Sequence, residues 1–119
     1  MRYIIAGPRT WTNDKFVDHI LDQYVAFGDT VITGKCPTGV DKMAEDYAER
    51  RFAKLETYPA DWDKHGKAAG PIRNRDMAED CRYSGGILIA IWDGKSRGTK
   101  NMIDNALKVR LETHVYFDE

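Results

Sequence analysis

The sequence lacks the long apolar segments that mark membrane-spanning proteins. Its longest apolar run, residues 86–92, is far shorter than the roughly 20 residues needed to cross a bilayer. The opening stretch MRYIIAGPR also lacks the apolar length and the cleavage pattern of a signal peptide. We therefore expect a cytoplasmic protein with no membrane partner.

Cysteine is scarce, and neither sign of charge dominates. Cys36 and Cys81 are the two cysteines and lack CxxC spacing, so we expect free thiols in a reducing compartment. Eighteen Lys and Arg balance 19 Asp and Glu for a net charge of −1, which argues against general attraction to nucleic acid or anionic membranes. The three histidines show no triad or zinc spacing, so we expect neither a metal nor a cofactor.

At 119 residues, 42% hydrophobic and 31% charged, the chain has the size and balance of one globular domain. No repeat, linker or low-complexity segment divides it, so we expect a single domain over residues 1–119. Short apolar runs alternate with segments of helical spacing. Strands are predicted at 2–6, 30–33, 55–59, 86–92 and 113–117, and helices at 16–25, 39–53, 72–81 and 102–110.

This alternation predicts βαβ units and an α/β, three-layer Rossmann-like fold. We expect a mostly parallel sheet of about five strands flanked by about four helices. The polar stretch 60–71 is predicted to be a long loop. Ligands of such folds bind outside the carboxyl ends of the strands, so the residues that follow the strands are the candidates for a site.

Two of the loops that follow strands carry glycines and hydroxyl residues directly before a helix. In GKCPTGVD, Gly34 and Gly39 would permit positive φ and close approach, and Thr38 would cap the helix. In DGKSRGTKN, Gly94 and Gly98 stand beside Ser96 and Thr99. Glycines are frequent in tight loops, but two such loops at matching positions favour a phosphorylated ligand at helix N-termini. Neither loop is the GxxxxGK[ST] phosphate loop.

Charged and aromatic residues near the same edge have alternative roles. Arg9 would contact phosphate or form a surface ion pair. Arg73 would contact the ligand or be satisfied by Asn74 and Asp76 nearby. Arg97 would contact the ligand or, like Lys95 in the same loop, simply be solvated. Trp11 and Trp62 would stack on a base or anchor their loops. Asp41 would bind a ribose hydroxyl or stabilise a helix start, and Asp93 would contact a sugar, act as a general base or form a turn.

Taken together, GPRTW, TGKCPTGVDKMAEDYA, PADWDKHGKAAGPIRNRDM and IAIWDGKSRGTKNMI resemble the YspA branch of the SLOG superfamily. This Rossmann-like group is related to YpsA, to the DNA-processing protein DprA and to the LOG phosphoribohydrolases, and many members occur in phages. The resemblance covers Arg2 to about Leu107. It implies binding of a nucleotide or nucleotide-derived ligand. The family motifs fall on Gly7, Pro8, Arg9, Gly34, Gly39, Asp41, Trp62, Gly70, Pro71, Arg73, Asn74, Met77, Asp93, Gly94, Gly98 and Thr99.

The resemblance to the LOG enzymes fails at one chemically important position. Aligning Gly98 and Thr99 with the GT of the LOG motif PGGxGTxxE places Met102 where the glutamate stands. A thioether cannot transfer protons. A LOG-type reaction would therefore need Asp93, Asp104 or another carboxylate in its place.

Three functions remain open at this stage. The first is binding of ADP-ribose, NAD or a signalling nucleotide by a sensor or sequestering protein. The second is hydrolysis of such a ligand, with Asp93 or Asp41 as the catalytic group. The third is DprA-like binding of single-stranded nucleic acid by Arg73, Arg75, Lys95, Arg97 and Lys100, which the net charge disfavours. A homo-oligomer is compatible with the pattern, which does not require one.

Overall fold

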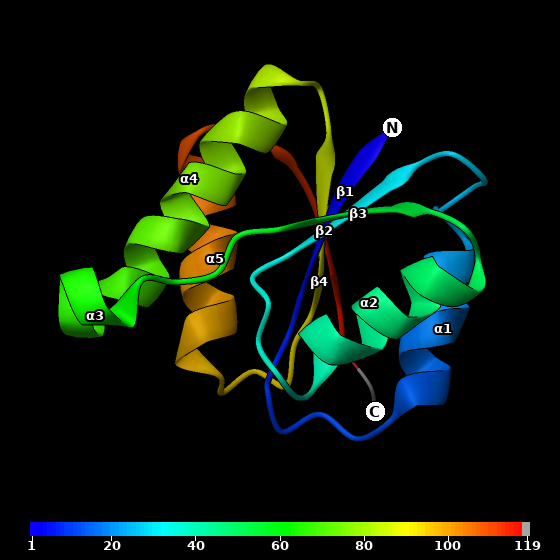
Figure 1. Cartoon of the computed structure of the whole chain (residues 1–119), viewed down its shortest axis with the longest axis horizontal. Helices are drawn as coiled ribbons and strands as arrows, with labels where there is room; N and C mark the ends of the chain where they lie inside the picture. The colour runs from blue at the N-terminus through cyan, green and yellow to red at the C-terminus, as the bar shows by residue number, and fades with distance from the viewer. Residues whose placement is uncertain (118–119) are drawn as a thin grey trace.

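A computed structural model describes residues 1–117 of the chain. Strands and helices alternate along it (Figure 1). The elements are β1 (Arg2–Ala6), α1 (Asp14–Asp22), β2 (Thr30–Thr33), α2 (Val40–Arg50), β3 (Lys54–Thr57), α3 (Trp62–His65), η1 (Gly66–Ala68), α4 (Ala69–Tyr83), β4 (Ile87–Ile91), α5 (Arg97–Lys108) and β5 (Glu112–Tyr116). No helix within residues 1–117 has both the length and the apolar character needed to cross a membrane.

The five strands form one parallel sheet in the order β3-β2-β1-β4-β5. Ile4 at the centre of β1 lies opposite Ile32 of β2 and Leu88 of β4. Every residue of β4 is buried, as expected of a strand covered on both faces. The predicted α/β, Rossmann-like fold is therefore confirmed.

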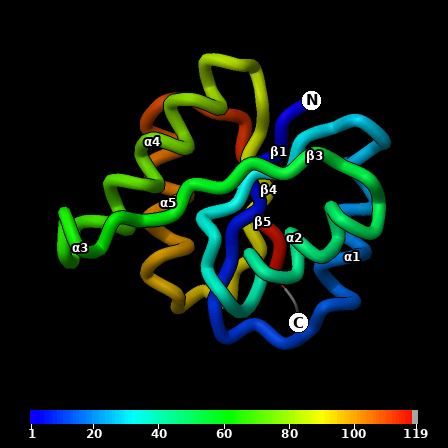
Figure 2. Tube along the Cα trace, viewed as in Figure 1, coloured from blue at the N-terminus to red at the C-terminus, as the bar shows by residue number. Residues whose placement is uncertain are grey.

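Helices cover both faces of the sheet (Figure 2). On one face, Val17, Ile20, Leu21, Val40 and Tyr47 of α1 and α2 pack with alternate residues of the strands. On the other, Met77, Ala78 and Cys81 of α4 and Met102, Ile103 and Ala106 of α5 form a second buried cluster with the remaining strand residues. The alternating side chains of β1, β2 and β4 join the two clusters into a three-layer core.

The stretch 60–71 differs from its prediction as a loop. It contains α3 and η1, and α4 begins at Ala69 rather than at residue 72. The Asp61 carboxylate caps α3 by accepting a hydrogen bond from Lys64 N at 3.1 Å. Pro71 does not prevent the earlier start of α4, because it lies in the first turn, where a backbone N–H has no acceptor within the helix.

Candidate functional site

A crevice of about 380 Å³ opens at the carboxyl ends of β1, β2 and β4. The chain builds the sheet outward from β1 to β3 and then returns to place β4 on the other side of β1. Ligands of open α/β sheets bind at such a change of direction. The volume lies within the usual range for small-molecule pockets.

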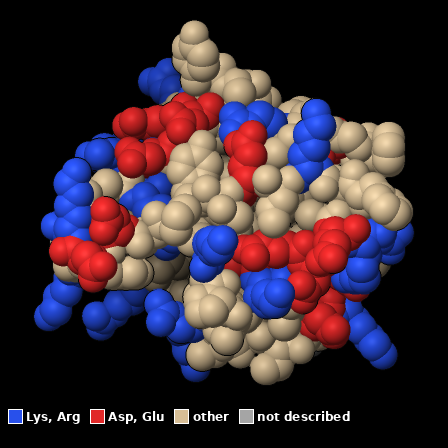
Figure 3. Space-filling model, viewed as in Figure 1, with Lys and Arg blue, Asp and Glu red and all other residues tan. Residues whose placement is uncertain are grey.

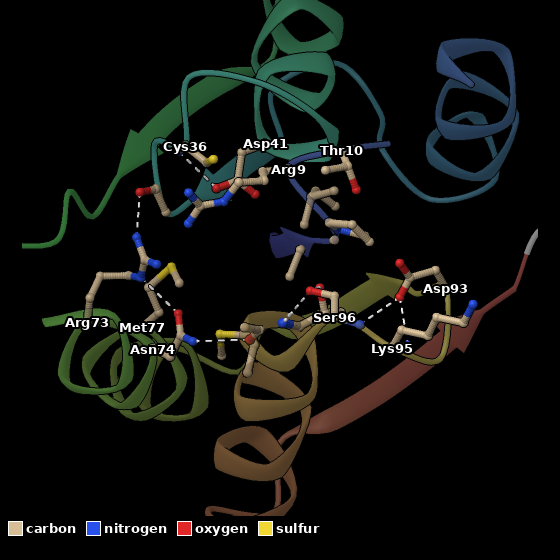
Figure 4. A pocket seen from close by; sticks show the side chains of 18 residues that line it. Arg9, Thr10, Cys36, Asp41, Arg73, Asn74, Met77, Asp93, Lys95 and Ser96 are labelled. Atoms are coloured by element: carbon tan, nitrogen blue, oxygen red, sulfur yellow. Dashed lines mark hydrogen bonds between the residues drawn. The ribbon is translucent and has the colours of Figure 1, made fainter. Parts of the chain in front are cut away.

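The crevice brings together eleven of the residues that the sequence singled out, from four separate segments (Figure 4). These are Gly7, Pro8, Arg9, Gly34, Asp41, Arg73, Asn74, Asp93, Ser96, Gly98 and Thr99. Six other candidates do not line it, namely Trp11, Thr38, Gly39, Trp62, Gly94 and Arg97. The described chain holds no cluster of three or more His, Cys, Asp or Glu side chains placed to bind a metal.

Arg73 reaches the crevice from α4 and is held by three hydrogen bonds. Its Nη1 donates to the carbonyl oxygens of Gly34 at 2.6 Å and Tyr58 at 3.3 Å, and its Nε donates to Asn74 Oδ1 at 2.8 Å. Burial lowers the pKa of the Arg73 guanidinium, and the charge of Arg9 lowers it further, whereas Asp41 raises it. The side chain is therefore fixed in position, and a second arginine stands close by.

Gly34 makes room for that guanidinium. A Cβ added to Gly34 would lie 2.5 Å from Arg73 Nη1 and 2.7 Å from its Cζ. The prediction of a positive φ at Gly34 is wrong, because the left-handed residue of this loop is Lys35, with φ 58°. The prediction that another group comes close to Gly34 is correct, but that group is the Arg73 guanidinium of the protein itself rather than a ligand.

Asp41 places a buried carboxyl at the wall of the crevice. It lies in the first turn of α2, and its Oδ2 accepts a hydrogen bond from Cys36 N at 3.1 Å. Burial raises the pKa of Asp41 to about 6, against the lowering effects of the Cys36 N–H and the charge of Arg73. The carboxyl thus titrates close to neutrality, beside two arginines.

This raised pKa predicts a specific pH dependence of stability. Because the folded protein holds the proton more tightly than the unfolded chain, Asp41 stabilises the fold at low pH. That contribution is lost as the pH rises from about 4 to above 6. Denaturant unfolding gives the free energy of unfolding of the wild type and of Asp41→Asn at each pH. The value for the variant minus the value for the wild type should rise by about 2–3 kcal/mol across this window. A constant difference from pH 4 to 7 would contradict the assignment.

Gly39 and Thr38 hold two loops of the protein together rather than facing the crevice. Gly39 has φ 76°, and an added Cβ would overlap the carbonyl oxygen of Pro8. Val40 N donates to that oxygen at 3.2 Å, and Thr38 Oγ1 donates to the carbonyl oxygen of Arg9 at 2.9 Å. The prediction that Thr38 caps α2 is wrong, since Gly39 occupies the cap position without a side-chain bond.

The start of α5 forms the opposite wall. Ser96 caps the helix, with its Oγ accepting from Thr99 N at 3.3 Å and from Thr99 Oγ1 at 3.0 Å. No neighbouring atom would lie within 4 Å of a Cβ added to Gly98, so the backbone there is open to the crevice. The N–H groups of the first turn have no acceptors within the helix, and the helix dipole favours an anion beside them.

Two side chains shape the loop that precedes α5. Asp93 Oδ1 accepts from Lys95 N and Ser96 N, both at 2.8 Å, and these bonds lower the pKa of the Asp93 carboxyl. Trp92 Nε1 donates to the carbonyl oxygen of Ser96 at 3.1 Å. Asp93 is therefore a turn-forming residue with a stabilised carboxylate, which makes it a poor proton donor.

The two tryptophans that were candidates for base stacking lie elsewhere. Trp11 donates from Nε1 to the carbonyl oxygen of Asn13 at 3.0 Å and packs against Phe16, with ring centroids 5.8 Å apart. Trp62 is 54% exposed on α3, beside Gly70, and no residue of α3 lines the crevice. Trp11 thus anchors its own loop.

Seven further residues line the crevice, namely Ile5, Ala6, Thr10, Cys36, Met77, Lys95 and Met102. The sequence marks Met77 as a family motif position and Lys95 as a nucleic-acid candidate, but neither was predicted to lie in the ligand site. Met77 and Met102 are buried on α4 and α5, and their helical spacing is the signal of a core position. The Met102 thioether lines the crevice at the residue that the resemblance aligns with the LOG glutamate. Asn74 joins the two helices by donating from Nδ2 to Asn101 Oδ1 at 3.0 Å.

The fold is Rossmann-like, with a crevice at the carboxyl edge of its parallel sheet. The chain belongs to the YspA, cpYpsA-related SLOG family (YAcAr), whose model matches residues 1–65. This confirms the resemblance drawn from the motifs. Family membership supports a nucleotide-related function in general.

Two individual proteins are also similar to the chain. The Gene 61 protein of Mycobacterium phage D29 is 31% identical over 118 residues, covering 92% of this chain and 91% of that protein. Among solved structures, the C-terminal domain of a hydrogenase from Pyrococcus furiosus has a TM-score of 0.49 at 10% identity, covering 97% of this chain and 90% of that one. The similarity to the phage protein therefore extends beyond residue 65 and includes Arg73 of α4 and the start of α5.

Proposed function

We propose that the chain binds a nucleotide-derived anion in the crevice, as a sensor or sequestering protein. The observation that carries this proposal is the placement of Arg9 and Arg73 at one pocket, close enough for the charge of Arg9 to lower the pKa of Arg73. Two like charges held together favour an anion between them, and the arginine fork suits the oxygens of phosphate.

Two further features support a phosphorylated ligand of modest size. Arg73 is already oriented by its bonds to Gly34 and Asn74, so ordering it on binding costs little entropy. The start of α5, with Gly98 open to the crevice, offers backbone N–H groups to a second anionic group. ADP-ribose, NAD and signalling nucleotides carry phosphates and a polar sugar that fit this set of contacts.

Hydrolysis of the same ligand is the second candidate, and Asp41 is the residue that favours it. Its pKa of about 6 suits proton transfer near neutral pH. Asp93 is disfavoured, because two backbone N–H groups stabilise its carboxylate. Incubation of the protein with the ligand, followed by chromatography for free base, ribose phosphate or phosphate, separates the two candidates. A product that the wild type forms and Asp41→Asn does not form would favour hydrolysis.

The basic residues considered for nucleic acid are mostly engaged within the chain. Arg75 pairs with Asp76 at 3.5 Å, Lys100 pairs with Asp104 at 2.9 Å, and Arg73 is turned inward. Figure 3 shows basic and acidic side chains interspersed on the face in view. A small anionic molecule is therefore the better supported partner.

Calorimetry with a panel of ADP-ribose, NAD, ADP and cyclic nucleotides tests the proposal. We expect at least one compound to bind more tightly than about 1 mM and to lose about 10- to 100-fold in affinity in Arg9→Ala, since a charge-assisted hydrogen bond contributes about 1.5–3 kcal/mol. Arg82→Ala is the matched control, because Arg82 is an exposed arginine at the far end of α4. A panel without binding, or equal losses in both variants, would refute the proposal.

A further inference from the structure

The outer edge of β3 is open. β3 is the terminal strand of the sheet, and Lys54, Leu55 and Glu56 are exposed. Lys54 N donates to the carbonyl oxygen of Asp29 at 2.8 Å, and Tyr58 N to that of Thr33 at 2.9 Å. Because successive amides of a strand point in opposite directions, the N–H and C=O groups of Leu55 and Thr57 face outward.

An apolar corner lies beside this edge and consists of Met1, Phe27, Phe52 and Leu55. Their exposed fractions are 60%, 86%, 78% and 45%. Asp29 draws the segments that carry them together, since Ala26 N donates to its carboxylate and Lys54 N to its carbonyl oxygen. The two loops lie at the same side of the molecule in Figures 1 and 2. Single exposed apolar side chains are ordinary, but a cluster marks a surface that binds a protein.

Phe52 adds a second indication because its backbone is strained. It has φ 56° and follows α2 at the position where helices commonly place glycine, with Ala53 N donating to the carbonyl oxygen of Ala48 at 2.9 Å. A left-handed conformation is costly for a bulky residue, and Phe52 gains no burial in return. A partner that covers its ring would supply that burial.

We propose that two copies of this chain associate through antiparallel pairing of their β3 edges, about a two-fold axis at Leu55. Leu55 and Thr57 direct their backbone N–H and C=O groups outward, so these are the residues that can form hydrogen-bonded pairs between the two copies. Centring on Lys54 or Glu56 would set like charges directly opposite one another, which is destabilising. Centring on Leu55 instead sets Lys54 of each copy opposite Glu56 of the other, which also pairs with Arg2 of its own chain. Opposite charges therefore favour this register over the other two.

The arrangement joins the two sheets into one and places the apolar corners next to the strand junction. It is isologous, as expected of a two-fold dimer. The crevice lies at the carboxyl ends of β1, β2 and β4 rather than at the outer edge of β3, so association leaves it open. The inference therefore stands independently of the proposed ligand.

Sedimentation equilibrium and light scattering of the full chain over about 1 to 200 µM test the dimer. We expect concentration-dependent dimerisation that Leu55→Pro weakens by at least about tenfold. Proline removes an outward N–H but no hydrogen bond within the sheet, so the fold should persist. Phe52→Gly should weaken the dimer as well, yet stabilise the monomer by relieving backbone strain.

Arg110→Gly is the matched control for that strain relief. Arg110 follows α5 with φ 60°, in the same conformation as Phe52 but away from the edge of β3. We expect it to stabilise the chain without changing association. Lys54→Glu should weaken the dimer, because it sets a carboxylate opposite Glu56 of the other copy. A wild type that stays monomeric, or that binds only extended peptides, overturns the proposal, as does a dimer that survives Leu55→Pro and Phe52→Gly.

Discussion

Gly34→Ala is expected to weaken ligand binding by about tenfold or more while changing the free energy of unfolding by less than about 1 kcal/mol. The new methyl group would lie 2.5 Å from Arg73 Nη1, so the guanidinium must leave the carbonyl oxygen of Gly34. The displaced group is the end of a flexible side chain, which makes the stability cost small. The loss of a prepositioned phosphate contact makes the binding cost large.

Calorimetry with ADP-ribose, or with the panel compound that binds most tightly, measures the effect, and denaturant unfolding measures stability. Gly70→Ala is the control, because an added Cβ there meets only the Trp62 ring, at an ordinary 3.4 Å, and the residue does not line the crevice. We expect its affinity to match that of the wild type. Unchanged binding by Gly34→Ala would show that the position of Arg73 does not matter for the ligand.

Gly39→Ala is expected to destabilise the fold by about 3 kcal/mol or more. Gly39 has φ 76° and ψ −148°, a region that is essentially restricted to glycine and costs a residue with a Cβ about 1–3 kcal/mol. The new methyl group would also overlap the Pro8 carbonyl oxygen and lie 2.5 Å from the Cα of Arg9. Both neighbours are backbone atoms, so neither can move without shifting the loop that carries Arg9.

Gly94→Ala separates the two causes of this loss. Gly94 has a nearly identical φ of 78°, but no neighbouring atom would lie within 4 Å of an added Cβ. We expect Gly94→Ala to cost about 1–2 kcal/mol by denaturant unfolding, from backbone strain alone. Equal losses in the two variants would mean that the contact between the loops contributes nothing.

The fold was predictable because its signals are local. The apolar runs 2–6 and 30–33 coincide with β1 and β2 to the residue, and the helical spacing of Val17, Ile20 and Leu21 marks the buried face of α1. The short α3 was missed because a four-residue helix is too short for any periodicity. Its start depends on one capping carboxylate, that of Asp61.

The site was less predictable, because a residue that follows a strand can face either the ligand or the protein. Gly39 and Asp93 have the types expected of ligand contacts, but Gly39 meets the backbone at Pro8 and Asp93 bonds to its own loop. The orientation of Arg73 depends on Gly34, which is 39 residues away in the sequence. Met102 shows the converse, since helical spacing marks it as core and it is buried, yet it also lines the crevice.

The central claim is that Arg9, Arg73 and the start of α5 surround one anionic ligand. Titration of ¹⁵N-labelled protein with ADP-ribose, followed by NMR, tests it most directly because each backbone amide reports its own surroundings. We expect the largest shifts at Arg9, Gly34 and Gly98, and we expect them to be lost in Arg9→Ala. Shifts confined to α3 or to the edge of β3, or shifts that persist in Arg9→Ala, would contradict it.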